Sequence, residues 1–255
     1  MPEAVTLTAI PDIPLIEPGD DLPAIVLAAV EQSLGDVQSG DVFIIAQKVF
    51  SKAEGRYAYL DEVAPTAEAV TLAEATEKDP RQVQLVLSES KEVLRHRPGV
   101  IIVVHRLGFV MANAGIDASN IGAPDGRERV LLLPVDPDAS AKKFKNAVKA
   151  ATGQDVAVIM SDSVGRAWRS GTVGIALGAA GVPSVVDLRG DPDLFGRPLQ
   201  SSIVGFADEV AAAGSLLQGQ GAEGAPVVLA RGLKMPWEPT PASALIRDVA
   251  EDLFR

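Results

Sequence analysis

The chain has 255 residues, of which 47% are hydrophobic, and it carries a formal net charge of −11 and no cysteine. This length and apolar content are enough for one large domain over residues 1–255 or for two small ones. The acidic charge argues against a protein that binds duplex nucleic acid, and the lack of cysteine excludes disulfides and thiolate chemistry. The first residues lack the pattern of a secretory signal, and no run approaches the roughly 20 apolar residues of a membrane-spanning helix. We therefore expect a cytoplasmic protein without a membrane segment.

The first part of the chain contains two strand-like runs around one helical pattern. Residues 5–10 have the composition of a strand, and prolines in residues 11–16 predict a stiff extended loop after it. A helix is predicted from residues 19–21 to about Leu34, because an aspartate can cap it there and Pro23 is tolerated in its first turn. Residues 42–46 are a continuous apolar run typical of a buried strand.

A cluster of cations follows this strand directly. Residues 47–56 read Gln-Lys-Val-Phe-Ser-Lys-Ala-Glu-Gly-Arg, so Lys48, Lys52 and Arg56 gather in an otherwise acidic chain. A solvated loop whose cations extend into water accounts for this composition as well as a binding role does. In a binding role, these are the charges that the phosphates of a nucleotide require.

The next segment predicts two short helices and a strand. Residues 65–76 and 80–90 each begin at a proline and carry apolar residues at helical spacing. Residues 95–99 predict a turn, and residues 100–104 a buried strand. The only histidines, His96 and His105, are not in a metal-ligand spacing, so we interpret both as structural or surface residues.

Two polar stretches follow apolar strands and share a carboxylate next to a hydroxyl. Residues 113–120, Asn-Ala-Gly-Ile-Asp-Ala-Ser-Asn, come after a strand at 109–112, and residues 161–169, Ser-Asp-Ser-Val-Gly-Arg-Ala-Trp-Arg, after a strand at 156–160. Taken alone, each stretch is most simply a surface turn. Together they indicate a site for a divalent metal and phosphate, because hard cations take oxygen ligands and arginines bind phosphate.

The segment between these stretches contains a well-marked helix. Apolar residues 131–133 lead to Asp136, which we interpret as the cap of a helix over residues 138–151 with Pro137 at its first position. Gly153 is expected to end it. Asp136 and Asp138 also form an Asp-x-Asp pair, but the capping role is the better interpretation.

The last third of the chain is rich in glycine. In residues 170–181 four glycines predict that another backbone approaches closely, either within the fold or across a subunit interface. Strands are predicted over residues 182–188, 203–204 and 227–230, and helices over 206–217 and 239–254. The run at 219–224 matches G-x-G-x-x-G, but it follows a helix and precedes a strand, which is the wrong context for a Rossmann fold. No P-loop motif occurs.

These motifs give the sequence a resemblance to the coenzyme F420-0:gamma-glutamyl ligase family over essentially its whole length. The motifs that carry it lie, in chain order, at residues 13–16 with 18–21, 51–56, 113–120, 133–140, 161–169 and 207–209. The resemblance implies an α+β fold with mixed sheets and flanking helices in two interleaved subdomains, which forms an intertwined homodimer and is neither Rossmann nor P-loop. It implies that GTP drives the addition of L-glutamate to the lactyl carboxylate of F420-0 through an acyl phosphate, with release of GDP and phosphate. Further glutamates would be gamma-linked.

The resemblance also implies cofactors and site residues. Paired Mn2+ or Mg2+ ions are expected, with K+ as a further cation. The metal ligands would be Asp117, Asp162 and Ser163, the last at a position where threonine is common. The nucleotide would be bound by Ile13, Pro14, Leu15, Ile16, Gln47, Lys52, Asn120 and Gln220. Gln47 stands where serine is usual in the family.

Arg166 is added on chemical grounds as an anion-binding residue that acts with Asp117 and Asp162 in catalysis. Arg169 could do the same or stack on Trp168 as a structural pair. Two alternatives to the ligase remain open at this stage. One is a related GTP-dependent ligase for a different carboxylate, which the residues of the sequence do not separate from the first. The other is a non-catalytic nucleotide-binding homodimer, against which the presence of both acidic residues argues.

Overall fold

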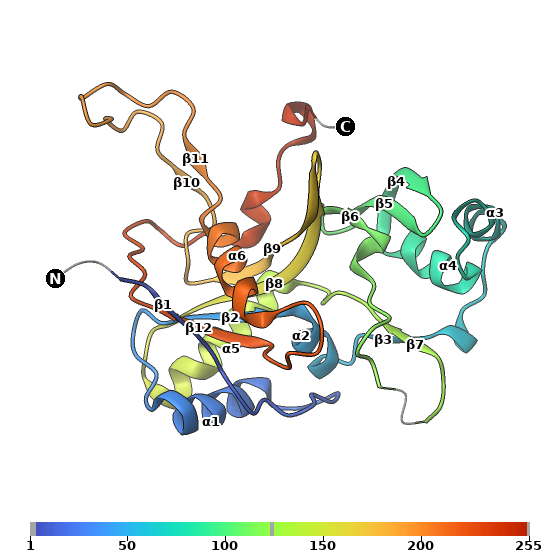
Figure 1. Ribbon diagram of the computed structural model, residues 1–255, viewed down its shortest axis with the longest axis horizontal. Coiled ribbons are helices and arrows are strands. Elements are labelled where there is room, and N and C mark those ends of the chain that lie inside the picture. Colours follow the sequence, from blue (N-terminus) through green and yellow to red (C-terminus); the bar gives the residue numbers. More distant parts are fainter. Residues whose placement is uncertain (1–3, 123–124, 254–255) are drawn as a thin grey trace.

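The computed structural model describes residues 4–122 and 125–253 and has an α+β architecture built on a five-stranded mixed sheet (Figure 1). The order of its strands is β1-β12-β2-β8-β9, of which only β2 and β8 are parallel neighbours. The strands are β1 (Thr6–Ala9), β2 (Val42–Ala46), β8 (Ala157–Arg166), β9 (Arg169–Ala180) and β12 (Val227–Arg231). The predicted α+β class with mixed sheets is thus confirmed.

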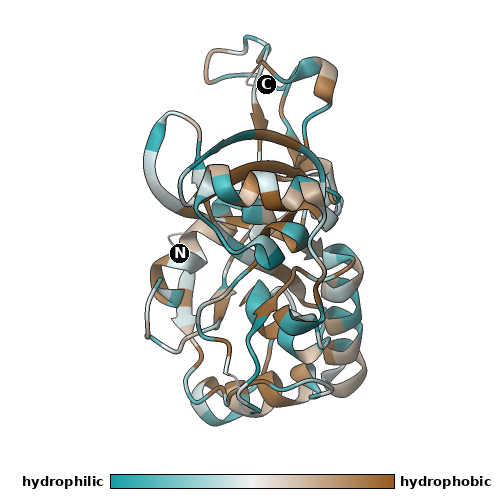
Figure 2. Cartoon of the chain, turned by 90° about the vertical axis from the view of Figure 1, so that its right-hand side faces the viewer, coloured by the Kyte–Doolittle hydropathy of each residue, from teal (hydrophilic) through white to brown (hydrophobic). Residues whose placement is uncertain are grey.

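The central strands of this sheet are buried on both faces, which explains their continuous apolar runs. In β2, Phe43 and Ile45 face a core shared with helices α1 (Leu22–Leu34) and α5 (Pro137–Thr152). Val42 and Ile44 face the opposite core, beneath helix α6 (Phe206–Gln218). The helices are banded in hydrophobic and hydrophilic colours in Figure 2, as expected where one side of a helix is buried.

The predicted helix caps are confirmed. The side chain of Asp21 accepts a hydrogen bond from the backbone N–H of Ala24, and that of Asp136 from Ala139. Pro23 and Pro137 lie in the first turns, where a missing N–H costs nothing. Gly153 ends α5 in the left-handed conformation.

A smaller three-stranded sheet, of order β4-β5-β6, is formed by a segment between helix α2 (Gln47–Ala53) and α5 (Figure 1, right). Its strands are β4 (Ser90–Arg97), β5 (Val100–His105) and β6 (Val110–Ala112), with helices α3 (Ala67–Thr76) and α4 (Pro80–Ser88) packed on them. Strands β3 (Tyr57–Tyr59) and β7 (Arg129–Leu131) pair with each other where the chain enters and leaves this segment. The 3-10 turns η1 (Leu60–Glu62) and η2 (Asn113–Gly115) follow β3 and β6.

Two elements extend away from the rest of the molecule. The pair β10 (Val186–Asp187) and β11 (Ile203–Val204) forms the base of a long arm, at the upper left of Figure 1. The β8–β9 hairpin curves upward to a tip at Trp168, whose side chain is 86% exposed. Of the helices within residues 4–122 and 125–253, none has the length and apolar character needed to cross a membrane.

Several predictions about the elements were wrong. Residues 47–53 form a helix and not the solvated loop that was one of two interpretations, because Val49 and Phe50 pack into the core while Lys48 and Lys52 stay partly exposed. Residues 95–97 belong to the edge strand β4 and not to a turn, since an edge strand with mostly exposed side chains lacks an apolar signature. Helix α3 begins at Ala67 and is capped by Thr66, two residues beyond the predicted proline.

The strand before the second acidic stretch is longer than expected. Strand β8 continues to Arg166 because β9 supplies a backbone partner for each residue, so Asp162 lies within a strand and not in a turn. The predicted strand at 182–188 is reduced to β10. The predicted helix at 239–254 is replaced by two short 3-10 turns, η3 (Ala242–Leu245) and η4 (Val249–Glu251), and Phe254 lies outside the described residues.

The glycines of β9 permit close backbone contacts inside the fold, as predicted. A Cβ atom at Gly178 would lie 2.3 Å from the carbonyl oxygen of Pro137, and one at Gly174 would lie 2.6 Å from that of Ala211. Both distances are shorter than any Cβ contact allows. Helices α5 and α6 therefore both pack directly against the backbone of β9.

Candidate functional site

A cleft of about 580 Å³ opens where the parallel pairing of β2 with β8 ends. In the strand register Ala46 pairs with Ser161, so the start of α2 and the Asp162 region lie side by side. The carboxyl ends of parallel strands are a common location for ligand sites. The lining residues come from five segments of the chain, at residues 13–16, 46–52, 117–120, 161–163 and 215–226, and from Gly174 of β9.

Helix α2 presents three polar side chains to Asp117 and the loop that follows it. Gln47 is buried, and its Oε1 accepts a hydrogen bond of 2.8 Å from the hydroxyl of Ser51, which leaves its Nε2 to donate to Oδ2 of Asp117 at 3.0 Å. Nζ of Lys48 lies 3.2 Å from Oδ1 of the same carboxylate. Nζ of Lys52 donates to the backbone oxygen of Asn120 at 3.0 Å. One face of a short helix therefore organises this wall of the cleft.

The position of Asp117 is fixed from both sides of its loop. Its backbone N–H and C=O both bond to Leu131 in an isolated bridge, at 3.0 and 2.9 Å. Upstream, Oδ1 of Asn113 accepts from the N–H of Ile101 at 3.1 Å, and Asn113 and Ala114 adopt the left-handed conformation. The polar residues predicted as a turn thus tie the loop to the smaller sheet.

Asp162 reaches the cleft from β8. Burial and the nearby negative charge of Asp117 raise the pKa of Asp162 to about 7, against the hydrogen bond that its Oδ1 accepts from the N–H of Ser163. The pKa of Asp117 is also raised by burial, although Lys48 and Gln47 act against this. The two carboxylates are partly desolvated, and the negative charge of each disfavours ionisation of the other. A cation bound between them would therefore be stabilising.

The donor set fits a hard divalent cation that also binds a ligand phosphate. It consists of carboxylate oxygens from Asp117 and Asp162 with the hydroxyl or carbonyl oxygen of Ser163, and contains no nitrogen or sulfur donor. No cluster of three or more acidic or histidine side chains suited to a metal occurs within residues 4–122 and 125–253. A metal here would therefore need oxygens from a substrate or water to complete its shell.

The remaining walls supply a cation, backbone groups and a glycine loop. Burial and the charge of Lys48 lower the pKa of Lys52. On the opposite side Gln218 accepts from the hydroxyl of Ser161 at 3.1 Å and donates to the carbonyl oxygen of Pro226 at 3.2 Å. These contacts hold the glycine-rich loop that contains Gln220 next to Ser161, in the middle of β8.

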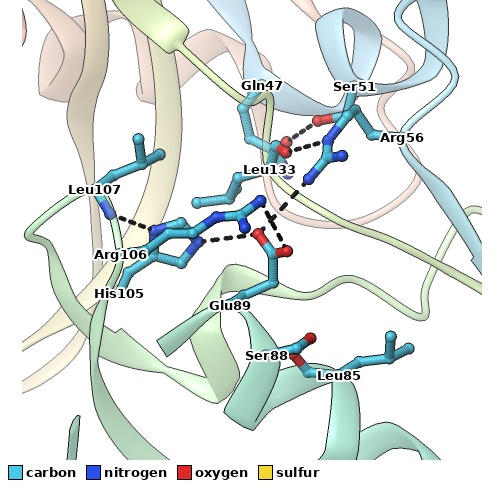
Figure 3. A network of polar contacts seen from close by, with 10 residues as sticks. All are labelled: Gln47, Ser51, Arg56, Leu85, Ser88, Glu89, His105, Arg106, Leu107 and Leu133. Carbon is cyan, nitrogen blue, oxygen red and sulfur yellow. Dashed lines mark hydrogen bonds and ion pairs between the residues drawn. The ribbon is translucent and has the colours of Figure 1, made fainter. Parts of the chain in front are cut away.

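An ionic network centred on the buried carboxylate of Glu89 lies next to the segment that follows α2 (Figure 3). Glu89, at the end of α4, receives Nη2 of Arg106 at 2.9 Å, while Nη2 of Arg56 and Nε2 of His105 lie 3.6 Å away. Nε of Arg56 donates to the carbonyl oxygen of Leu133 at 2.8 Å. Burial alone would raise the pKa of Glu89, but His105 and the two arginines together lower it. The network joins the smaller sheet to the segment that leaves α2.

The structure brings together nearly all residues that the sequence singled out. The residues that line the cleft are Ile13, Pro14, Leu15, Ile16, Gln47, Lys52, Asp117, Asn120, Asp162, Ser163 and Gln220. Arg166 does not line it, because it lies at the exposed end of β8 opposite Arg169. Its role stays a prediction without a contact to support it.

Among the other polar residues of the cleft, Lys48 was predicted only as part of a basic cluster, and Ser161 and Gln218 were given no role of their own. The signal for Lys48 was its spacing of four residues from Lys52, which places both on one side of a helix. That signal required α2 to be predicted as a helix.

Comparisons with known proteins agree with this geometry. A family model described as F420-0:Gamma-glutamyl ligase matches residues 11–232. The Coenzyme F420:L-glutamate ligase of Methanopyrus kandleri is 46% identical over 94% of this chain and 93% of its own length. Those of Methanothermobacter thermautotrophicus and Methanocaldococcus jannaschii are 43% and 42% identical, over 91% and 86% of this chain and 90% and 86% of their own lengths. The matched region contains every residue that lines the cleft.

Proposed function

This chain belongs to the F420-0:gamma-glutamyl ligase family and is a ligase that adds glutamate to F420-0. We propose that the cleft at the end of the β2–β8 pairing is its active site and that GTP drives the reaction there. The observation that carries this proposal is the convergence of Asp117 and Asp162 opposite Lys48 and Lys52. The two carboxylates can bind a metal ion, and the two lysines opposite them can bind the triphosphate of GTP and the carboxylate of the acceptor.

The chemistry requires activation of a carboxylate. A carboxylate does not condense with an amine in water at neutral pH, so the gamma-phosphoryl group of GTP is transferred to the lactyl carboxylate of F420-0. This step breaks a phosphoanhydride bond and forms an acyl phosphate and GDP. The amine of L-glutamate then attacks the acyl carbon, loses a proton and displaces phosphate. Further glutamates are added through gamma links.

The residues of the cleft have distinct parts in this scheme. Asp117, Asp162 and Ser163 would hold Mn2+ or Mg2+, which when bound supplies neutralisation of the phosphate oxygens. The buried Gln47 orients the carboxylate of Asp117 through its Nε2. Lys52 binds the phosphates, and residues 13–16, Asn120 and Gln220 bind the remainder of the nucleotide. We extend the proposal to a pair of divalent ions and to K+ as an additional cation.

The proposal also covers assembly and location. At the tip of the β10–β11 arm the side chains of Leu194 and Phe195 are 100% and 86% exposed, which favours burial of this arm in a homodimer. The cleft draws on segments from Ile13 to Pro226, so the chain acts as a single functional domain. An enzyme that consumes GTP and glutamate is expected in the cytoplasm.

The test is mass spectrometry of F420-0 incubated with the protein, GTP, L-glutamate and Mn2+, with a reaction that lacks GTP as control. A GTP-dependent gain of one or more glutamyl units is the expected result. Release of GDP without that gain would support the proposed active site but would indicate that the acceptor is a different carboxylate. Neither product would indicate a nucleotide-binding protein without this activity and would overturn the proposal.

A further inference from the structure

The β3–β7 pair has two very different faces. Ala58 and Val130 point into a small apolar core with Leu60. The alternate residues Tyr57 and Tyr59 on β3, and Arg129 on β7 with Arg127 just before it, point to the other face and are only partly buried. This second face carries two arginines and two tyrosines, of which Arg129 lies within electrostatic range of Lys52 in the cleft. None of the proposed catalytic steps uses them.

The two arginines form matching stacks on the two tyrosines. The guanidinium carbon of Arg127 lies 4.0 Å from the ring centre of Tyr59, and that of Arg129 lies 4.0 Å from the ring centre of Tyr57. Such stacking holds a planar guanidinium in one orientation. The geometry of the two pairs is therefore nearly the same.

Their electrostatic surroundings differ. Arg127 donates to Asp61 and Glu62, each at 2.6 Å, so two carboxylates neutralise it. Arg129 has no carboxylate within ion-pair distance in the described part of the chain, and its Nε donates to the backbone oxygen of Gly122 at 2.6 Å. The two Nη groups of Arg129 form the end of the guanidinium that suits an anion with two oxygens.

Arg129 does not line the cleft itself, but it bonds to the same loop as the cations of α2. Lys48, Lys52 and Arg129 bond to Ser119, Asn120 and Gly122 respectively, which are neighbours on one loop. The charge of Arg129 also contributes to lowering the pKa of Lys52, so the two cations lie within electrostatic range. In a protein of net charge −11, a cation that is oriented but not neutralised, beside two others, marks a place for a ligand anion.

We propose that Arg129, held flat on Tyr57, is a further anion-binding residue of this active site and binds a phosphate group of a substrate. The inference rests on the proposed function, which brings two phosphate-containing substrates to the cleft. One source is the triphosphate of GTP, and the other is the phosphodiester of F420-0. Both present two oxygens to a guanidinium fork.

The test compares Arg129→Gln and Arg129→Lys with Arg127→Gln, the matched control that removes an equally stacked but neutralised arginine. Binding of GTP in the presence of Mn2+ is measured by calorimetry, and binding of F420-0 by the fluorescence of its deazaflavin. Thermal denaturation of each variant reports on folding. We expect Arg129→Gln to weaken one of the two ligands by roughly ten- to a hundredfold and to flatten the salt dependence of its binding. Arg129→Lys is expected to lose part of this affinity, and Arg127→Gln almost none.

The outcomes separate this inference from the proposed function. Loss of GTP affinity alone assigns Arg129 to the nucleotide, and loss of F420-0 affinity alone assigns it to the acceptor. The inference is overturned if Arg129→Gln binds both ligands as the wild type does. It is also overturned if the variant binds both ligands equally weakly and has a lower melting temperature. In either case the proposed function still holds if the wild type forms the glutamylated product. If the wild type forms no glutamylated product but Arg129→Gln still loses GTP affinity, the inference stands and the proposed function fails.

Discussion

Nζ of Lys48 lies 3.2 Å from Oδ1 of Asp117, so a lysine of α2 neutralises one of the two carboxylates proposed as metal ligands. Asp162 has no cation within ion-pair distance in residues 4–122 and 125–253. Burial and the negative charge of Asp117 raise the pKa of Asp162 to about 7, whereas Lys48 and Gln47 oppose the rise that burial causes in the pKa of Asp117. A metal that binds both carboxylates would therefore compete with Lys48 for Asp117.

Asp117→Asn and Asp162→Asn are each expected to lower turnover by more than about a hundredfold, since loss of a direct ligand exceeds the ten- to hundredfold effect of an outer partner. Circular dichroism should show both variants folded. Turnover is measured by glutamylation of F420-0 at saturating Mn2+. Near-normal activity in either variant would remove that residue from the metal site.

Asp162→Asn is also expected to stabilise the fold, and to do so only at higher pH. The pKa of Asp162 in the folded state, about 7, lies above its pKa in the unfolded chain. Ionised Asp162 therefore destabilises the fold once the pH exceeds the unfolded-state pKa, and this destabilisation reaches its full size above pH 7. The gain in unfolding free energy should reach up to about 4 kcal/mol at pH 8 and vanish near pH 4. Urea titrations at several pH values test this, and a gain independent of pH would contradict it.

Lys52→Ala is expected to weaken GTP binding about tenfold, the effect of removing one charge-assisted hydrogen bond to phosphate. Lys78→Ala is a suitable control, because Nζ of that lysine donates to the carbonyl oxygen of Gly99, in the turn between β4 and β5, and Lys78 does not line the cleft. Calorimetry with GTP and Mn2+ gives both dissociation constants. Equal values for the two variants would remove Lys52 from the phosphate site.

Glu89→Gln is expected to destabilise the protein by about 3–5 kcal/mol at pH 7, because it leaves the charges around Glu89 without their buried partner. The pKa of Glu89 is lowered in the folded state. The stability that ionised Glu89 contributes is therefore present at pH values above the ordinary pKa of about 4.3. It is lost as the pH falls through the lowered pKa of the folded state. The two unfolding curves should converge in acid. A constant difference down to pH 3 would show that the lost stability is not ionic.

Gly178→Ala is expected to destabilise by about 1–3 kcal/mol or more, because its Cβ would meet the carbonyl oxygen of Pro137 at 2.3 Å. Gly165→Ala, on the neighbouring strand of the same hairpin, has nothing within 4 Å of its Cβ and should be close to neutral. Denaturant midpoints for the two variants provide the comparison. Equal midpoints would mean that α5 can move away from β9 without cost.

The local features of this chain were predictable wherever a residue acts on its own neighbours. Asp21, Asp136 and Gly153 cap helices through bonds to adjacent backbone, and the apolar runs of β2 and β5 are strands in any context that buries them. The polar stretches around Asp117 and Asp162 were recognisable by composition, and the structure places both in one cleft.

The features that were not predicted depend on pairing with another segment of the chain, whether that segment is next in sequence or far away. β4 is a strand because β5 lies beside it, and β8 extends past Asp162 because β9 does. The pairing of Lys48 with Asp117 joins residues 69 positions apart, given their numbers in the chain. Arg166 looked suitable for anion binding by its type and spacing, but the hairpin carries it away from the cleft.

The strand order of the central sheet has a consequence for how this protein acquires its structure. β1 and β2 are separated from each other by β12, and β2 is joined to β8 more than a hundred residues later. Only the β8–β9 hairpin pairs segments that are adjacent in sequence. Pairings of this kind slow folding, because a long loop must close before the contact forms. During synthesis β2 must therefore wait for β8 to emerge, and β1 for β12, so the ability to bind GTP should appear late.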